Sequence, residues 1–195
     1  MEELVAKELP AEFGEFLRDT GRLPPEAMTY LPAREVPEPD QRLLVHPHDM
    51  TSTLAAFHGS ALRVEILQRR RIGDYYLREV FLRTQNTARI VEYGLIAIVL
   101  GQFTPPQQAE ILTGRLPLGG LLHRYQIPFA SAPICFFSVA TGGLEQTHRT
   151  ALNHATCYGR FNRLSKRTGE PLAWIMEILP HTPPERAGRL EIENT

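Results

Sequence analysis

Alternating apolar and polar residues dominate the middle of the chain. Leu62, Val64 and Ile66 alternate with polar neighbours, and Tyr75 to Arg83 continues with the same period of two. The stretch from Arg89 to Leu100 is more uniformly apolar, which is typical of a strand that is buried on both faces. Short polar connections separate the three segments. The pattern therefore predicts three neighbouring strands with antiparallel pairing.

Further strands are predicted towards the C-terminal end. Cys157 to Ser165 and Pro171 to Leu179 form a candidate pair, joined by a turn at 168–170. An apolar patch from Ile134 to Val139 is a candidate for another strand, although prolines and glycines make its surroundings the least readable part of the chain. Together with the first three segments, these predict five or six strands.

Helical spacing and end signals predict four helices. Proline favours the first turn of a helix, a small polar residue caps its start, and glycine commonly ends it. Asp49 is such a cap, and it precedes an apolar stripe at helical spacing. The predicted helices lie between Pro10 and Gly21, from Met50 to about His58, from Pro105 to Gly114, and from Leu118 or Gly119 after Pro117.

These elements predict an α+β fold in which a single, mostly antiparallel six-stranded sheet is covered by helices. A length of 195 residues suits a single domain with a full core. Within this domain, 1–40 is expected to hold the N-terminal helix and an arm rich in proline. Residues 41–180 are expected to form the core of the fold, and 181–195 a polar tail.

Composition and charge exclude several classes of partner. The net charge of −1 argues against nucleic acid or an anionic membrane, because these partners usually require a basic excess. No stretch reaches the roughly 18 apolar residues of a membrane span, and the acidic start lacks the apolar core of a signal peptide. The two cysteines are too few for a disulfide framework. We therefore expect a cytoplasmic protein, with a monomer as the default.

Two charged residues fall on apolar strand faces. Arg78 shares its face with Tyr76 and Val80, and Glu177 shares its face with Ile175. A buried guanidinium does not neutralise itself by losing a proton, so it needs an anion opposite it. The identity of that anion decides what Arg78 is for.

Three anions are open as partners of Arg78. Arg78 and Glu177 could form one internal salt bridge, or Glu92 on the neighbouring strand could pair with Arg78. Alternatively, Arg78 could bind a ligand carboxylate in a pocket whose far end presents Glu177 to a hydroxyl group. Glu79 is not a candidate, because it points to the opposite face of its strand.

Two helix starts could assist an anionic ligand. First-turn amides have no intrahelical partner, and the helix dipole attracts anions to them. The amide of Met50 is one such group if Asp49 caps its helix, and the amide of Leu118 after Pro117 is another. Because every helix has a first turn, these amides indicate an acidic ligand only in combination with a cation such as Arg78.

Three other clusters have simpler interpretations. In His46-Pro47-His48, the intervening proline and the lack of a third spaced ligand favour a loop over a metal site. His154 and Cys157 are similarly expected to pack or to lie at the surface. The arginine run 69–71 is expected to be a solvated strand end, which could steer an anionic substrate. No metal is predicted.

Five short blocks of the chain resemble bacterial chorismate pyruvate-lyases. The blocks occur in that family's order and span roughly residues 41 to 180, so the resemblance makes this segment a lyase-like core. The blocks are Asp49-Met50-Thr51, then 76–80, Pro117-Leu118-Gly119, Gly159-Arg160 with Arg163-Leu164, and 169–172 leading to Glu177 and Leu179-Pro180.

The resemblance implies a fold, a reaction and a site. The fold is a six-stranded antiparallel sheet with helices and a closed internal site, and the reaction converts chorismate to 4-hydroxybenzoate and pyruvate without a metal or organic cofactor. Residue by residue, the resemblance implies that Arg78 binds the ring carboxylate together with the backbone amides of Met50 and Leu118. Glu177 would meet the 4-hydroxyl group, either as a base or only to position the ring.

The chain departs from the family pattern at three positions. Gly120 stands where an arginine is expected, Met176 where a threonine is usual, and Phe161 in a region where a further arginine is common. These departures concern contacts around the site and the enolpyruvyl carboxylate. Two alternatives therefore stay open, namely 3-hydroxybenzoate as the product, and a non-catalytic domain that binds small aryl acids.

Overall fold

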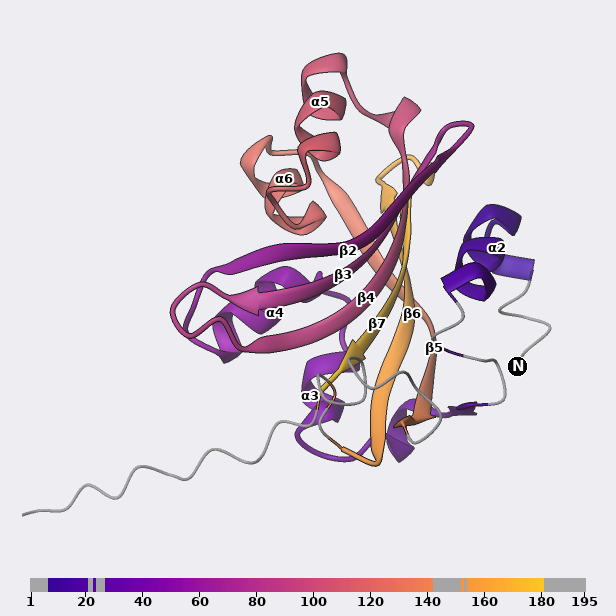
Figure 1. Ribbon diagram of the computed structural model, residues 1–195, viewed down its shortest axis with the longest axis vertical. Helices are drawn as coiled ribbons and strands as arrows, with labels where there is room; N and C mark the ends of the chain where they lie inside the picture. Colours follow the sequence, from indigo (N-terminus) through magenta and orange to yellow (C-terminus); the bar gives the residue numbers. More distant parts are fainter. Residues whose placement is uncertain (1–6, 21–22, 24–26, 142–151, 153, 181–195) are drawn as a thin grey trace, which may run out of the picture.

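One antiparallel sheet organises the protein. The computed structural model describes residues 7–20, 23, 27–141, 152 and 154–180. Within these residues seven strands form a single open sheet in the order β1-β5-β6-β7-β4-β3-β2, and every neighbouring pair is antiparallel (Figure 1). The α+β class and the antiparallel sheet are confirmed. The predicted count of six strands is wrong, because β1 adds a seventh.

The strands and helices have the following bounds. The strands are β1 (Met28–Leu31), β2 (Leu62–Ile72), β3 (Tyr75–Thr84), β4 (Ile90–Val99), β5 (Phe129–Ala140), β6 (Thr156–Lys166) and β7 (Pro171–Leu179). The α-helices are α2 (Ala11–Thr20), α3 (Asp40–Leu44), α4 (Met50–Phe57), α5 (Pro105–Thr113) and α6 (Leu118–Arg124), with short 3-10 helices η2 (Ala33–Glu35) and η3 (Leu100–Gln102).

The extra strand lies in the arm rich in proline. Met28–Leu31 pairs with the end of β5, so that Met28 is opposite Val139. Four residues between prolines are too few to show a period of two, and the pairing partner lies about a hundred residues away along the chain. The strand therefore exists because β5 offers an edge, which the local pattern does not reveal.

Two predicted strands are longer than their patterns indicated. The patch from Ile134 to Val139 is part of β5, which includes Pro133 at a bulge before Cys135. A bulge accommodates a proline because the ladder is locally interrupted there. Similarly, β2 continues through the arginine run 69–71, after a bulge beyond Ile66. The bulges break the alternation on which the predictions relied.

The two faces of the sheet carry different layers. Helix α2 lies on one side, where Phe13 and Phe16 pack into the largest apolar cluster with side chains of β3, β4, β5, β6 and β7 (Figure 1). Helices α3, α4, α5 and α6 lie on the other side. There the starts of α4 and α6 come together, and charged residues of the strands face them. This second face carries the candidate site.

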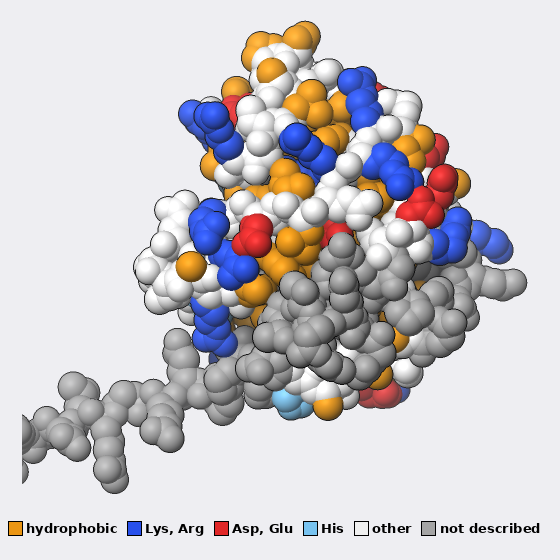
Figure 2. Space-filling model, in the orientation of Figure 1, with side chains coloured by type: hydrophobic (Ala, Val, Ile, Leu, Met, Phe, Trp, Pro, Cys, Tyr) orange, Lys and Arg blue, Asp and Glu red, His pale blue; other side chains and the backbone are white. Residues whose placement is uncertain are grey.

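The surface gives no sign of a single basic patch on the face that Figure 2 shows. Lys and Arg side chains lie there in separate groups, with apolar and uncharged surface between them (Figure 2). None of the helices in the described part of the chain is long and apolar enough to cross a membrane. The predicted polar tail, 181–195, lies outside the described residues.

Candidate functional site

A cavity lies between the sheet and the starts of α4 and α6. Met50, Arg78, Leu118 and Glu177, the four residues that the sequence singled out, all line it. Its volume is about 50 Å³, and a single water needs roughly 10–15 Å³ on that scale. The remaining lining residues are mostly apolar, with Asp49, Thr51, Glu92 and Asn162 as the other polar ones. The structure thus brings the predicted residues together from four elements.

Arg78 is a buried cation with unused donors. It lies on β3 opposite Ile96 of β4, and its residue is 2% exposed. Its Nε and Nη1 atoms have no hydrogen-bond partner among the described residues. The guanidinium carbon lies 5.7 Å from the centre of the Tyr76 ring, a weak cation–π contact. Burial lowers the pKa of Arg78 to about 10, so the side chain is still charged at neutral pH.

Neither protein carboxylate that was considered as a partner for Arg78 pairs with it. No ion pair joins Arg78 to Glu177 or Glu92 in the described part of the chain. Glu79, as predicted, lies on the opposite face, where it accepts a hydrogen bond of 3.0 Å from the hydroxyl of Tyr93. The anion that Arg78 needs is therefore not supplied by these three side chains.

Glu177 has a different partner, which the sequence pattern does not predict. Arg160 of β6 lies opposite Glu177 of β7, and its Nε donates to Glu177 Oε2 at 2.5 Å. Both residues are buried, with exposed fractions of 0% and 2%. Burial raises the pKa of Glu177, while Arg160 opposes that rise. Arg160 lies in one of the five blocks, so the sequence does draw attention to it. Its position opposite Glu177 depends on the register of β6 with β7, which the sequence does not give.

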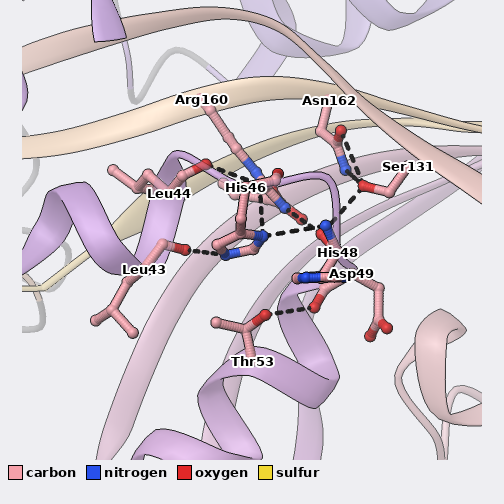
Figure 3. A network of polar contacts seen from close by, with 10 residues as sticks. Leu43, Leu44, His46, His48, Asp49, Thr53, Ser131, Arg160 and Asn162 are labelled. Carbon is pink, nitrogen blue, oxygen red and sulfur yellow. Dashed lines mark hydrogen bonds and ion pairs between the residues drawn. The ribbon is translucent and has the colours of Figure 1, made fainter. Parts of the chain in front are cut away.

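Arg160 also holds the loop that leads into α4. Its Nη1 donates to the carbonyl oxygens of Leu44 at 2.8 Å and His46 at 3.0 Å, and its Nη2 donates to the carbonyl oxygen of His48 at 3.1 Å (Figure 3). The Nη1 and Nη2 atoms, which do not take part in the ion pair with Glu177, thus donate to backbone carbonyl groups. Arg160 thus joins the sheet to the residues directly before Asp49, and its charge is already compensated by the protein.

His46 belongs to the same network through both of its ring nitrogens. Its Nε2 lies 2.7 Å from the carbonyl oxygen of Leu43, and its Nδ1 faces the amide of His48 at 3.2 Å and Arg160 Nη1 at 3.5 Å (Figure 3). Burial and then the positive charge of Arg160 lower the pKa of His46. Among the described residues no group of three or more His, Cys, Asp or Glu side chains could hold a metal ion.

The start of α4 is built as predicted. Asp49 accepts a hydrogen bond of 2.9 Å from the amide of Ser52, which makes it the N-cap. The helix begins at Met50, so the amide of Met50 is a first-turn donor with no carbonyl to bond in its own helix. Helix α6 begins at Leu118 after Pro117, and its first amide is in the same position. Both residues line the cavity.

The two helix starts are packed tightly against each other. A Cβ atom on Gly119 would lie 2.6 Å from Asp49 Oδ1 and 2.9 Å from Thr51 Oγ1, so only glycine allows this approach. His123 of α6 adds a polar link, with its Nε2 at 3.0 Å from Asp49 Oδ2 and 3.0 Å from Ser52 Oγ. The starts of α4 and α6, which cover the cavity, are therefore held together by the close approach of Gly119 to Asp49 and by the hydrogen bonds of His123.

Glu92 is a second acidic residue in the cavity. It is 4% exposed, and its Oε2 has no hydrogen-bond partner among the described residues. Burial raises its pKa well above the ordinary value, and the negative charge of Glu177 raises it further, while Arg160 opposes the rise. The sequence pattern offers Glu92 only as a partner of Arg78, whereas the structure places its carboxyl group over Gly94, the residue opposite Glu177.

The cavity thus combines one uncompensated cation with two carboxyl groups. Such an arrangement can bind a small organic anion by its carboxylate at Arg78 and by a polar group at the acidic end. Comparisons with known proteins add nothing to this picture. The chain matches no protein-family model, and it matches no curated protein.

Proposed function

We propose that this protein is a chorismate lyase-like enzyme, which eliminates pyruvate from chorismate and forms 4-hydroxybenzoate. The observation that carries the proposal is Arg78, a buried charge that lines the cavity and has two donors without a partner among the described residues. Desolvating a guanidinium without an anion is costly, and a ligand carboxylate removes that cost. The five sequence blocks that resemble chorismate pyruvate-lyases point to the same ligand.

The other lining groups suit a cyclic acid with a hydroxyl group. The first-turn amides of Met50 and Leu118 are oriented donors for the carboxylate that Arg78 binds. Glu177 lies opposite Gly94, two residues along β4 from Ile96, the residue that faces Arg78. Arg78 and Glu177 therefore lie at different levels of the cavity, so a ring between them would direct its carboxylate to one and its hydroxyl to the other.

The elimination of pyruvate from chorismate requires few catalytic groups from the protein. Loss of the enolpyruvyl arm makes the ring aromatic, which supplies the driving force, so no cofactor is required by the chemistry. The protein has to hold a reactive conformer, exclude water and stabilise the charge that develops when the C–O bond breaks. A cavity of about 50 Å³ is small for chorismate, so it has to widen when the substrate enters.

A second function is favoured by one observation. Chorismate has two carboxylates, whereas Arg78 is the one Lys or Arg among the described residues that line the cavity. A domain that binds a small aryl acid with a single carboxylate, without catalysis, would use the same groups. The regulator effector modules to which such domains are related provide the precedent for this alternative.

Product analysis tests both functions. Purified protein is given chorismate, pyruvate is followed with a coupled dehydrogenase, and the aromatic product is identified by chromatography against 3- and 4-hydroxybenzoate. We expect equimolar pyruvate and 4-hydroxybenzoate. If the wild type binds 4-hydroxybenzoate in calorimetry but releases no pyruvate, the lyase proposal is wrong and the binding function replaces it.

Glu177→Gln tests the role of the acidic end. The amide oxygen of glutamine can still accept a hydrogen bond from Arg160, so we expect the fold and binding of 4-hydroxybenzoate to remain. Turnover should fall about 10²–10⁴-fold if the carboxylate takes part in proton transfer. Unchanged turnover would show that Glu177 has no chemical role.

A further inference from the structure

Glu92 is a cavity carboxyl group that the proposed function does not use. Its residue is only 4% exposed, and its Oε2 makes no hydrogen bond with any described residue. Leaving a polar atom unpaired in the interior is costly, so such an atom in a cavity indicates a catalytic role or a partner that binds there. The position of Glu92 decides which part of a ligand it faces.

Glu92 leans over Gly94, to the level of Glu177 on the sheet. A Cβ atom built on Gly94 would lie 2.9 Å from Glu92 Oε1, so the Glu92 side chain covers Gly94. Gly94 is the residue opposite Glu177, whereas Arg78 lies opposite Ile96, two residues beyond Gly94 on β4. The two carboxyl groups therefore lie together at one end of the cavity, and the free cation lies at the other.

The two carboxyl groups have unequal surroundings. Arg160 donates to Glu177 at 2.5 Å, so its positive charge stabilises the ionised form of Glu177. The Nη1 and Nη2 atoms of Arg160 donate to backbone carbonyl groups. Glu92 has no such partner among the residues that the structure describes, and the negative charges of Glu177 and Asp49 both act against its ionisation. Neighbouring carboxyl groups in unequal surroundings divide the roles of acid and base between them.

We propose that Glu92 is protonated in the resting enzyme and donates its proton to the enolpyruvyl arm of the substrate while Glu177 accepts a proton from the ring. This inference rests on the proposed lyase function. A substrate held by its ring carboxylate at Arg78 has its hydroxyl-bearing carbon at Glu177, and the ether carbon is the adjacent ring atom. The enolpyruvyl arm therefore leaves from the ring on the side where Glu92 lies beside Glu177.

The proposed step balances in protons and electrons. The ring C–O bond breaks, and its electron pair leaves with the oxygen of enolpyruvate. The C–H bond at the hydroxyl-bearing carbon breaks, its electrons complete the aromatic ring, and the proton goes to Glu177. Glu92 gives its proton to the methylene carbon of enolpyruvate, which becomes the methyl group of pyruvate. Transfer of the proton from Glu177 to ionised Glu92 then restores the resting state.

Glu92→Gln is the first test, because glutamine has nearly the same shape but no proton to transfer. We expect turnover of chorismate to fall about 10²–10⁴-fold, with binding of 4-hydroxybenzoate retained. Glu79→Gln is the matched control, since Glu79 is equally buried, at 0% exposed, but lies on the opposite face of the sheet. Circular dichroism verifies that both variants are folded. Wild-type turnover in a folded Glu92→Gln protein overturns the proposal.

Isotope labelling tests the path of the proton. In a single turnover in D₂O, with enzyme in excess over chorismate, Glu92 starts with a deuteron, so pyruvate trapped at once as lactate should carry one deuterium in its methyl group. Later turnovers are avoided, because Glu177 passes the ring proton to Glu92 after each one. A methyl group without deuterium would mean that the ring hydrogen moves directly to the arm, and the acid role of Glu92 would be wrong. Deuterium incorporation together with slow turnover of Glu92→Gln supports the proposal.

A third measurement does not depend on turnover. Infrared difference spectroscopy at neutral pH should show the carbonyl band of a protonated carboxyl group in the wild type, and Glu92→Gln should remove it while Glu79→Gln retains it. Absence of a band that depends on Glu92 overturns the proposal. Failure of the function itself looks different, because then the wild type releases no pyruvate, whereas failure of the acid role leaves an active wild type.

Discussion

Arg78 and Arg160, which both lie on the sheet face covered by α3 to α6, are almost equally buried but differ in their hydrogen-bond partners. Their exposed fractions are 2% and 0%. Arg160 donates to a carboxylate and three carbonyl oxygens, whereas Nε and Nη1 of Arg78 have no partner among the described residues. The charge of Arg160 is compensated, and its hydrogen bonds hold the sheet and the loop before α4 together. The charge of Arg78 has no protein anion beside it among the described residues, so it is available to bind the anion of a ligand. The contrast separates the structural end of the cavity from its binding end.

The largest expected effect is on stability at the Arg160 end. Arg160→Met leaves Glu177 buried without its cation and releases the loop carbonyls before Asp49. Breaking a buried pair in this way costs about 3–5 kcal/mol, so the midpoint of urea unfolding should fall sharply. Arg78→Met is the control, because it removes a charge that no described side chain compensates and should not lower the midpoint. Equal losses in both variants would remove the distinction.

The second effect is on ligand binding at the Arg78 end. Arg78→Met should weaken binding of 4-hydroxybenzoate by about 2–5 kcal/mol, which calorimetry detects as a loss of measurable affinity. Release of pyruvate from chorismate should disappear with it. Arg83→Met provides a comparison on the same strand, where Arg83 already pairs with Glu65, and affinity should be unchanged. Wild-type affinity in Arg78→Met would contradict the assignment of the binding end.

A smaller effect is expected where the two helix starts meet above both ends. In Gly119→Ala the new methyl group would overlap Asp49 Oδ1, at 2.6 Å, and overpacking of this kind costs about 1–3 kcal/mol. Gly120→Ala is the matched control, because its methyl group would meet only Pro117 Cδ at 3.9 Å, an ordinary contact. Thermal unfolding of the two variants should differ by that amount. Similar stabilities would show that the helix starts yield easily.

The smallest effect within any one pH unit is on the pH dependence of stability. The pKa of Glu92 is raised in the folded protein, so the stability from its protonated form is complete below its ordinary pKa and is lost as pH rises through the raised value. In Glu92→Gln this loss should be absent, a difference of at most about 1.4 kcal/mol per pH unit. Urea unfolding from pH 4 to 9 measures it, with Glu35→Gln at the surface as a control. Parallel curves would mean that Glu92 does not hold its proton more tightly in the folded state.

Much of the fold could be read from local patterns. The helix capped by Asp49 begins at Met50, and the strands from Tyr75 and from Pro171 lie where alternation predicted them. These features depend on residues within a few positions of each other, which is why one sequence suffices. The strand at Met28–Leu31 could not be found in this way, because its existence depends on the free edge of β5.

The candidate site divides along the same line. The sequence alone determined that Arg78 needs an anion, because a guanidinium on an apolar strand face carries its desolvation cost wherever the chain folds. Only the tertiary structure decided which carboxylates are already used. The register of β6 with β7 places Arg160 opposite Glu177, and the absent side chain of Gly94 lets Glu92 lean to the same end. Pairing across strands depends on register, and register is a property of the assembled sheet.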